Sequence, residues 1–148
     1  MSVNKLKQEE TYTMSIIYPM FTLVMLTFVI IFAVGASRLI AVRKRQVNPK
    51  LYKLMSGYEA PDYVQQFTRN LSNLLEVPIL FYLLGVLLIA MQIEDSTMVT
   101  MAWVFVALRF FHTAIHITYN HIIHRFMVFV ASALTLLAMW IKFILLMA

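Results

Sequence analysis

Long apolar stretches separated by short polar segments dominate this chain. Asp, Glu, Lys and Arg are absent from residues 11–37, 77–93, 96–108 and 126–141. A helix needs about 20 apolar residues to cross a bilayer, and it satisfies its own backbone hydrogen bonds there. The pattern predicts an all-α integral membrane four-helix bundle, one domain over residues 1–148, with spans at about residues 15–42, 64–93, 98–119 and 125–147.

The third apolar stretch is too short to span a membrane alone, because residues 96–108 fall well below about 20 residues. The third helix must therefore carry Arg109 and His112, with His116 beyond them, into the bilayer. Ionisable side chains at membrane depth are costly and mark functional sites. These residues are candidates for a site.

The composition agrees with a membrane protein, since 61% of residues are hydrophobic and 13% are charged, against about 25% charged residues in soluble domains. The net charge of +5 needs no nucleic acid, because basic residues collect beside cytoplasmic membrane ends and attract anionic lipid headgroups. The chain has no cysteine, which excludes a protein thiol nucleophile and a thiolate metal site.

The basic residues also predict how the bundle is oriented. Those between the first two spans are Arg38, Arg43, Lys44, Arg45, Lys50, Lys53 and Arg69, whereas the second connection offers Glu94 and Asp95. By the positive-inside rule the first connection is cytoplasmic, and both termini lie on the non-cytoplasmic side. Arg125 agrees with this orientation and Lys142 opposes it. We expect the membrane to be a bacterial inner membrane.

Arg69, Asn73 and Glu76 form a first polar group near the start of the second span. Their spacing places them on one helical face. A forked cation, an amide and a carboxylate suit a zwitterionic ligand that carries carboxylate and ammonium groups. An ion pair that fastens two helices is the alternative, and the residues alone leave both interpretations open.

Arg109, His112 and His116 form a second stripe on the third span, continued by Tyr119 or Asn120. The two histidines have the spacing of metal ligands on one helical turn, but a metal site needs further ligands. We therefore expect no metal there. Arg125, at the start of the fourth span, adds its charge to the positive helix N-terminus and could stabilise an anion such as a thiolate; alternatively it is a topological anchor.

With these residues the chain resembles the MAPEG family, the membrane-associated proteins in eicosanoid and glutathione metabolism, which includes microsomal glutathione transferases and leukotriene and prostaglandin E synthases. The resemblance lies in RNLSNLLEVP at residues 69–78 and in Arg109-x-x-His112 with Arg125 sixteen residues beyond Arg109. It implies a homotrimer that holds glutathione, a co-substrate, between subunits near the cytoplasmic side.

The resemblance also implies roles for individual residues. Arg69, Asn73, Glu76 and His112 would hold glutathione, and Arg125 would stabilise its thiolate and so be the catalytic residue. Arg109 and His116 join the glutathione-binding candidates because they lie on the same stripe. Family members often have Tyr where this chain has His116, some have Arg in place of Ser72, and some have polar residues near Phe126 and Phe129.

The favoured function is that of a glutathione-dependent transferase or peroxidase. Its substrates would be hydrophobic electrophiles or lipid hydroperoxides that enter from the bilayer. The alternative is a non-catalytic lipid-binding or scaffold trimer, which Phe126, Phe129 and Ser72 favour. A histidine metal or haem site is a third, weaker hypothesis.

Overall fold

The protein is a bundle of long helices in the computed structural model, which describes residues 3–54 and 59–147. The helices are α1 (Val3–Arg43), α2 (Lys50–Leu54), α3 (Asp62–Ala90), α4 (Ser96–Ile117) and α5 (Ile122–Met147). Within these described residues there is no strand, and four helices are long and apolar enough to cross a membrane. The predicted all-α four-helix membrane architecture is confirmed, whereas its assembly into a trimer stays a prediction.

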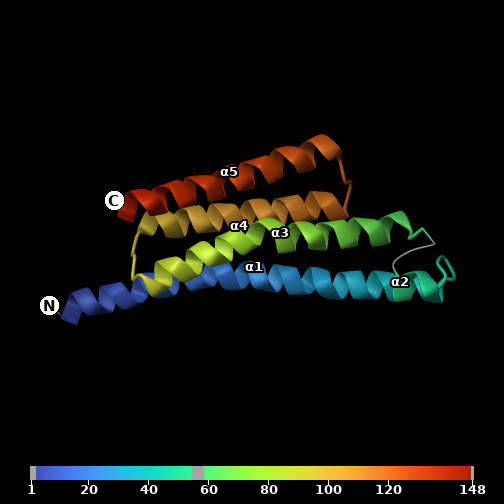
Figure 1. Ribbon diagram of the computed structural model, residues 1–148, viewed down its shortest axis with the longest axis horizontal. Coiled ribbons are helices and arrows are strands. Elements are labelled where there is room, and N and C mark those ends of the chain that lie inside the picture. Colours follow the sequence, from blue (N-terminus) through green and yellow to red (C-terminus); the bar gives the residue numbers. More distant parts are fainter. Residues whose placement is uncertain (1–2, 55–58, 148) are drawn as a thin grey trace.

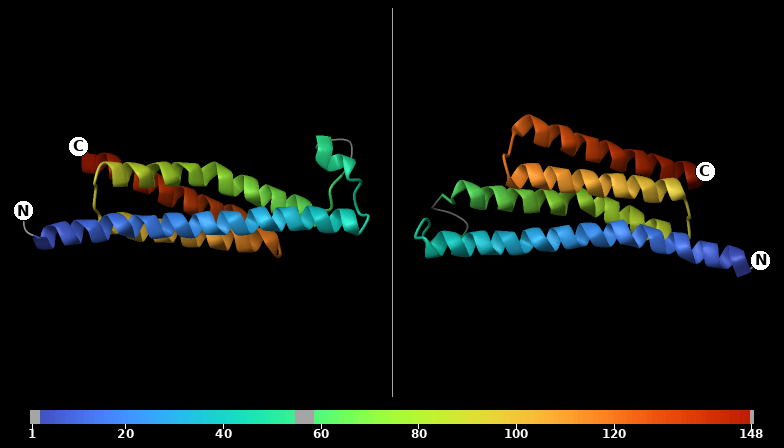
Figure 2. Two further views of the ribbon diagram at one scale, coloured as in Figure 1. Left: turned by 90° about the horizontal axis from the view of Figure 1, so that it is seen from below. Right: turned by 180° about the vertical axis from the view of Figure 1, so that it is seen from behind.

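The helices run lengthwise beside one another, with the start of α1 and the end of α5 at one end of the bundle (Figure 1). The turn between α4 and α5 lies toward the opposite end, and α1 and α3 extend past it to the place where α2 is located (Figure 2). The basic residues that follow α1 therefore share an end with the α4–α5 turn. We call this the turn end of the bundle and the other the terminal end.

The helix bounds differ from the predicted spans by a few residues at most ends. Residues before the predicted first span are also helical, from Val3, and no Gly or Pro interrupts them before Pro19. The side chain of Asp95 accepts a hydrogen bond from the Met98 N–H at 2.9 Å and so starts α4 at Ser96. Capping and turn residues, not hydrophobicity, decide these ends.

The connection between α1 and α3 contains a short helix, α2. The side chain of Asn48 accepts from the Lys50 N–H at 2.9 Å and begins α2. Leu51 then packs with Ala41, Val47 and Val64 in a small apolar cluster of its own. This cluster fastens the connection to the ends of α1 and α3.

Side chains from all four long helices form the main core. At its centre the rings of Phe81 and Phe105 lie 4.8 Å apart between their centroids. The fourth long helix, α5, packs mainly on α4 and touches α3 only lightly, and no contact between α1 and α5 occurs in the part of the chain that is described. The helices α3 and α4 therefore lie between α1 and α5 (Figure 1).

Candidate functional site

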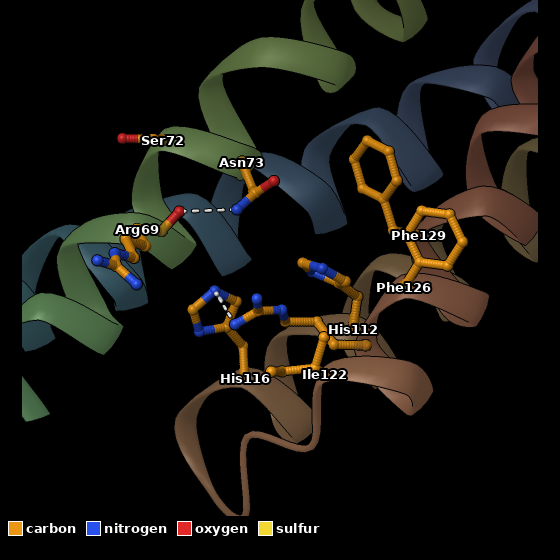
Figure 3. A pocket seen from close by; sticks show the side chains of 9 residues that line it. Arg69, Ser72, Asn73, His112, His116, Ile122, Phe126 and Phe129 are labelled. Atoms are coloured by element: carbon orange, nitrogen blue, oxygen red, sulfur yellow. Dashed lines mark hydrogen bonds between the residues drawn. The ribbon is translucent and has the colours of Figure 1, made fainter. Parts of the chain in front are cut away.

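A cavity of about 360 Å³ lies at the turn end of the bundle, between α3, α4 and α5. Its volume falls within the roughly 300–1,000 Å³ typical of small-molecule sites. Figure 3 shows its walls, which consist of Arg69, Ser72, Asn73, His112, His116, Ile122, Arg125, Phe126 and Phe129. The polar residues come mainly from α3 and α4, and the apolar ones come from α5.

The cavity brings together most of the residues predicted for the site. Arg69, Asn73, His112, His116 and Arg125 line it. The other two predicted residues do not line it: Arg109 is buried behind the wall and Glu76 is exposed on the outer surface of α3. That the lining residues bind a ligand stays a prediction.

The α3 wall contributes a cation and an amide. Arg69 is exposed, so its guanidinium keeps access to water. One turn later, the side-chain nitrogen of Asn73 donates to the main-chain oxygen of Arg69 at 2.9 Å, and this bond is drawn in Figure 3. The bond fixes the orientation of the amide, because it assigns the nitrogen to the backbone.

Arg109 connects this wall to α4. Its side chain is 0% exposed, and its Nη2 donates to the main-chain oxygen of Asn73. The guanidinium lies 5.9 Å from the ring centroid of Phe129 and is close enough to Glu76 for the opposite charges to attract. Its Nε and Nη1 have no hydrogen-bond partner. Arg109 therefore supports the cavity wall from behind.

The α4 wall consists of two histidines whose side chains are 2% and 1% exposed, His112 and His116. Their rings meet nearly edge to face, with centroids 5.7 Å apart, and Nδ1 of each has no hydrogen-bond partner. Buried polar atoms without partners are uncommon in native proteins. The two rings line the cavity, but their Nδ1 atoms are buried and lack a partner within the subunit.

Arg125 lies in the first turn of α5. Its Nη1 donates to the side-chain oxygen of Asn120 at 2.7 Å and lies 3.4 Å from Nε2 of His116. Arg125 and Arg69 are the charged residues of the lining, which includes no acidic residue. The helix N-terminus adds to the positive potential, so the cavity favours an anion.

Glu76 differs from the other candidates because it lies at the middle of α3 with an exposed side chain. No hydrogen bond or ion pair of its carboxylate is found among the described residues. A carboxylate on the outer surface of a membrane span is costly. Within one subunit, attraction to the buried Arg109 offsets part of this cost.

Among the described residues, no group of three or more His, Cys, Asp or Glu could hold a metal ion. Sequence reasoning also missed two features of the site. It did not separate Arg109 from the residues that line the cavity. A second buried contact also joins α3 to α4: Oγ1 of Thr113 donates a hydrogen bond to Oδ1 of Asn70 at 3.4 Å. It did not find Ile122, which follows the turn.

Comparison with known proteins agrees with this architecture. A family model described as the MAPEG family matches residues 16–145, which include all four spanning helices almost completely. No curated protein and no solved structure matches the chain. Because the family model covers nearly the whole chain, the protein belongs to the MAPEG family and is an integral membrane protein of four spanning helices.

Proposed function

We propose that the protein is a membrane-embedded glutathione-dependent transferase or peroxidase that acts on hydrophobic electrophiles or lipid hydroperoxides. The observation that carries the proposal is the cationic cavity, in which Arg69 and Arg125 face a space walled by two buried histidines. Glutathione has two carboxylates, an ammonium group and a thiol. The fork of Arg69 suits a carboxylate, and the amide of Asn73 suits the peptide groups.

Arg125 is the catalytic residue of the proposal. A thiol of ordinary pKa, about 8.5, is mostly protonated at neutral pH, and a nearby guanidinium stabilises the thiolate. The thiolate would attack an electrophilic carbon, form a thioether and displace the leaving group. With a hydroperoxide it would take one oxygen and release the alcohol, and a second glutathione would then convert the sulfenic acid to disulfide and water.

The assembly in this proposal is a homotrimer with glutathione between subunits. Glu76 supports it, because a neighbouring subunit would cover the exposed carboxylate and bring it a partner such as the ammonium group of the ligand. In this proposal Glu76 binds glutathione at the interface between two subunits and not in the cavity of a single subunit.

The hydrophobic substrate would reach the thiolate from the lipid. Phe126 is 64% exposed on the outside of α5 and also lines the cavity with Phe129 and Ile122. This apolar wall separates the charged interior from the bilayer and offers a surface to an apolar molecule. Glutathione would enter at the turn end, which we propose is cytoplasmic because α1 ends there at Arg43 and is followed by Lys44 and Arg45. The termini would then be non-cytoplasmic, and the membrane a bacterial inner membrane.

The test is ultraviolet difference absorption of the detergent-solubilised protein with glutathione, in which a bound thiolate absorbs at about 240 nm. We expect the band in the wild type and in Lys44→Ala, a matched loss of an exposed cation outside the cavity. Arg125→Ala should lose it while the protein still folds, as its thermal unfolding transition shows. A wild-type protein without the band at saturating glutathione contradicts the proposal, as does a band that survives Arg125→Ala.

A second candidate is a non-catalytic lipid-binding or scaffold trimer, which the aromatic wall of Phe126 and Phe129 favours. Such a protein would retain lipid through purification and show no turnover of chlorodinitrobenzene or cumene hydroperoxide. Mass spectrometry of the extracted lipid, together with both activity assays, distinguishes it from the proposed enzyme.

A further inference from the structure

The turn between α4 and α5 contains a residue that contacts Arg125 directly. Asn120 accepts a hydrogen bond on its side-chain oxygen from Nη1 of Arg125, at 2.7 Å. His116 Nε2 lies 3.4 Å from the same nitrogen. Both contacts therefore use one edge of the guanidinium. Arginine carries five N–H donors, so its remaining N–H groups stay available on the side of Nε and Nη2.

The backbone at this position explains why an asparagine fits. Asn120 has a φ of 47°, in the left-handed region that few residues other than Gly, Asn and Asp adopt readily. Its N–H donates to the main-chain oxygen of Ile115 at 2.8 Å and so closes the end of α4. The same residue thus makes the turn and presents an acceptor to the first turn of α5.

The chemistry of the acceptor matters as much as its position. An amide oxygen is neutral, so it orients the guanidinium without cancelling its charge. An Asp at the same place would adopt the same backbone and accept the same hydrogen bond, but it would form an ion pair and reduce the positive potential in the cavity. Gly would keep the turn without any acceptor.

We propose that Asn120 is a positioning residue, which fixes one edge of the Arg125 guanidinium so that the other edge faces the cavity with its charge intact. The anchoring of Arg125 follows from the contacts of the single subunit. Its consequence for a thiolate rests on the proposed function. The two parts are tested by separate measurements.

The first measurement does not depend on glutathione. Phenylglyoxal modifies arginines, and mass spectrometry gives the rate at Arg125 in the purified, ligand-free protein. We expect the rate to rise severalfold in Asn120→Gly and to stay at the wild-type value in Tyr119→Phe. The control removes the contact of the Tyr119 hydroxyl with Nδ1 of His124, 3.2 Å, on the same turn. Equal rates in Asn120→Gly and the wild type would overturn the anchoring.

The second measurement is the pH titration of the thiolate band of bound glutathione. Asn120→Gly should raise the thiol pKa by about one unit, because a guanidinium without its anchor spends less time facing the thiolate and stabilises the charge less. Asn120→Asp should raise it as well, although its Arg125 is modified as slowly as in the wild type, because the charge is then neutralised. A faster modification with an unchanged thiol pKa would overturn the positioning role.

These results also separate this inference from the proposed function. If the wild type shows no thiolate band, the proposed function fails, and the phenylglyoxal rates still decide whether Asn120 holds Arg125. If the band is present and the thiol pKa in Asn120→Gly and in Asn120→Asp equals that of the wild type, the proposed enzyme function is retained and the positioning role is wrong.

Discussion

The two ends of the bundle treat their polar groups in opposite ways. At the terminal end, Asp95 caps α4 through the Met98 N–H and forms an ion pair with Lys142 at 2.9 Å. At the turn end, Nε and Nη1 of Arg109 and Nδ1 of both His112 and His116 are buried without a partner. At the terminal end these charged groups pair with each other, whereas at the turn end several buried polar atoms lack a partner.

The difference has an energetic meaning. A paired carboxylate and ammonium at a helix start stabilise the fold modestly, whereas a buried polar atom without a partner costs about 1–3 kcal/mol. A protein keeps such costs at a site that a ligand completes. We infer that the polar groups of the terminal end stabilise the fold, whereas those of the turn end lower its stability and contribute to ligand binding. The following experiments test this difference.

The largest effect is expected from Arg69→Gln, which removes a cation from the cavity. Glutathione affinity should fall about 10- to 100-fold, because hydrogen bonds to charged groups contribute about 1.5–3 kcal/mol. The side chain is exposed, so the free energy of unfolding should change little. Titration calorimetry in detergent measures the affinity. Lys142→Met, the loss of a cation at the other end, is the control; an equal loss of affinity there would remove the contrast between the ends.

Arg109→Met is expected to leave the protein as stable as the wild type or more stable by about 1 kcal/mol, because apolar replacements of buried charged groups are often neutral or stabilising. The cost of burying two Arg109 nitrogens without partners offsets the stabilisation from its hydrogen bond to the main-chain oxygen of Asn73. Thermal unfolding in one detergent measures the change. A clear fall in the unfolding midpoint would show that Arg109 is mainly a structural tie, and that the turn end is less costly than proposed.

Asp95→Ala should destabilise the protein by about 1–2 kcal/mol, the sum of a lost helix cap and a partly exposed ion pair. The thiolate band should be unchanged, since Asp95 lies at the end opposite the cavity. Asp95→Asn is the matched control, because it keeps a capping oxygen and loses the charge. If both variants are equally destabilised, the ion pair and not the cap accounts for the effect.

Sequence reasoning reached the fold because the apolar stretches alone require spanning helices. It misplaced helix ends because these depend on single turn residues, such as the cap at Asp95 and the left-handed Asn120. It also grouped Arg109 with His112, since they share a helical stripe, whereas the packing of α3 against α4 buries the arginine and opens the histidine to the cavity. Helical periodicity predicts which residues share a face of a helix, but the packing of the neighbouring helix determines which of them are buried and which line a cavity.

The smallest effect concerns Lys142 and acid. Burial alone would raise the pKa of Asp95, but hydrogen bonds from Lys142 and from the Met98 N–H outweigh it and lower that pKa. A carboxyl with a lowered pKa in the folded state contributes stability above its unfolded pKa, and this contribution is lost as pH falls through the folded pKa. Wild-type stability should therefore decline in acid as Asp95 is protonated.

Lys142→Met removes the strongest of the groups that lower this pKa. At neutral pH it should cost less than about 1 kcal/mol, because the side chains of Lys142 and Asp95 are 28% and 20% exposed and water screens the pair. Part of the acid-dependent decline should disappear with it, since the folded and unfolded pKa values of Asp95 move closer. Thermal midpoints measured from neutral pH down to about pH 3, below the ordinary pKa of Asp, test this. A decline identical to that of the wild type would mean that Asp95 owes its pKa to the helix start alone, and that Lys142 lies beside it without stabilising the terminal end.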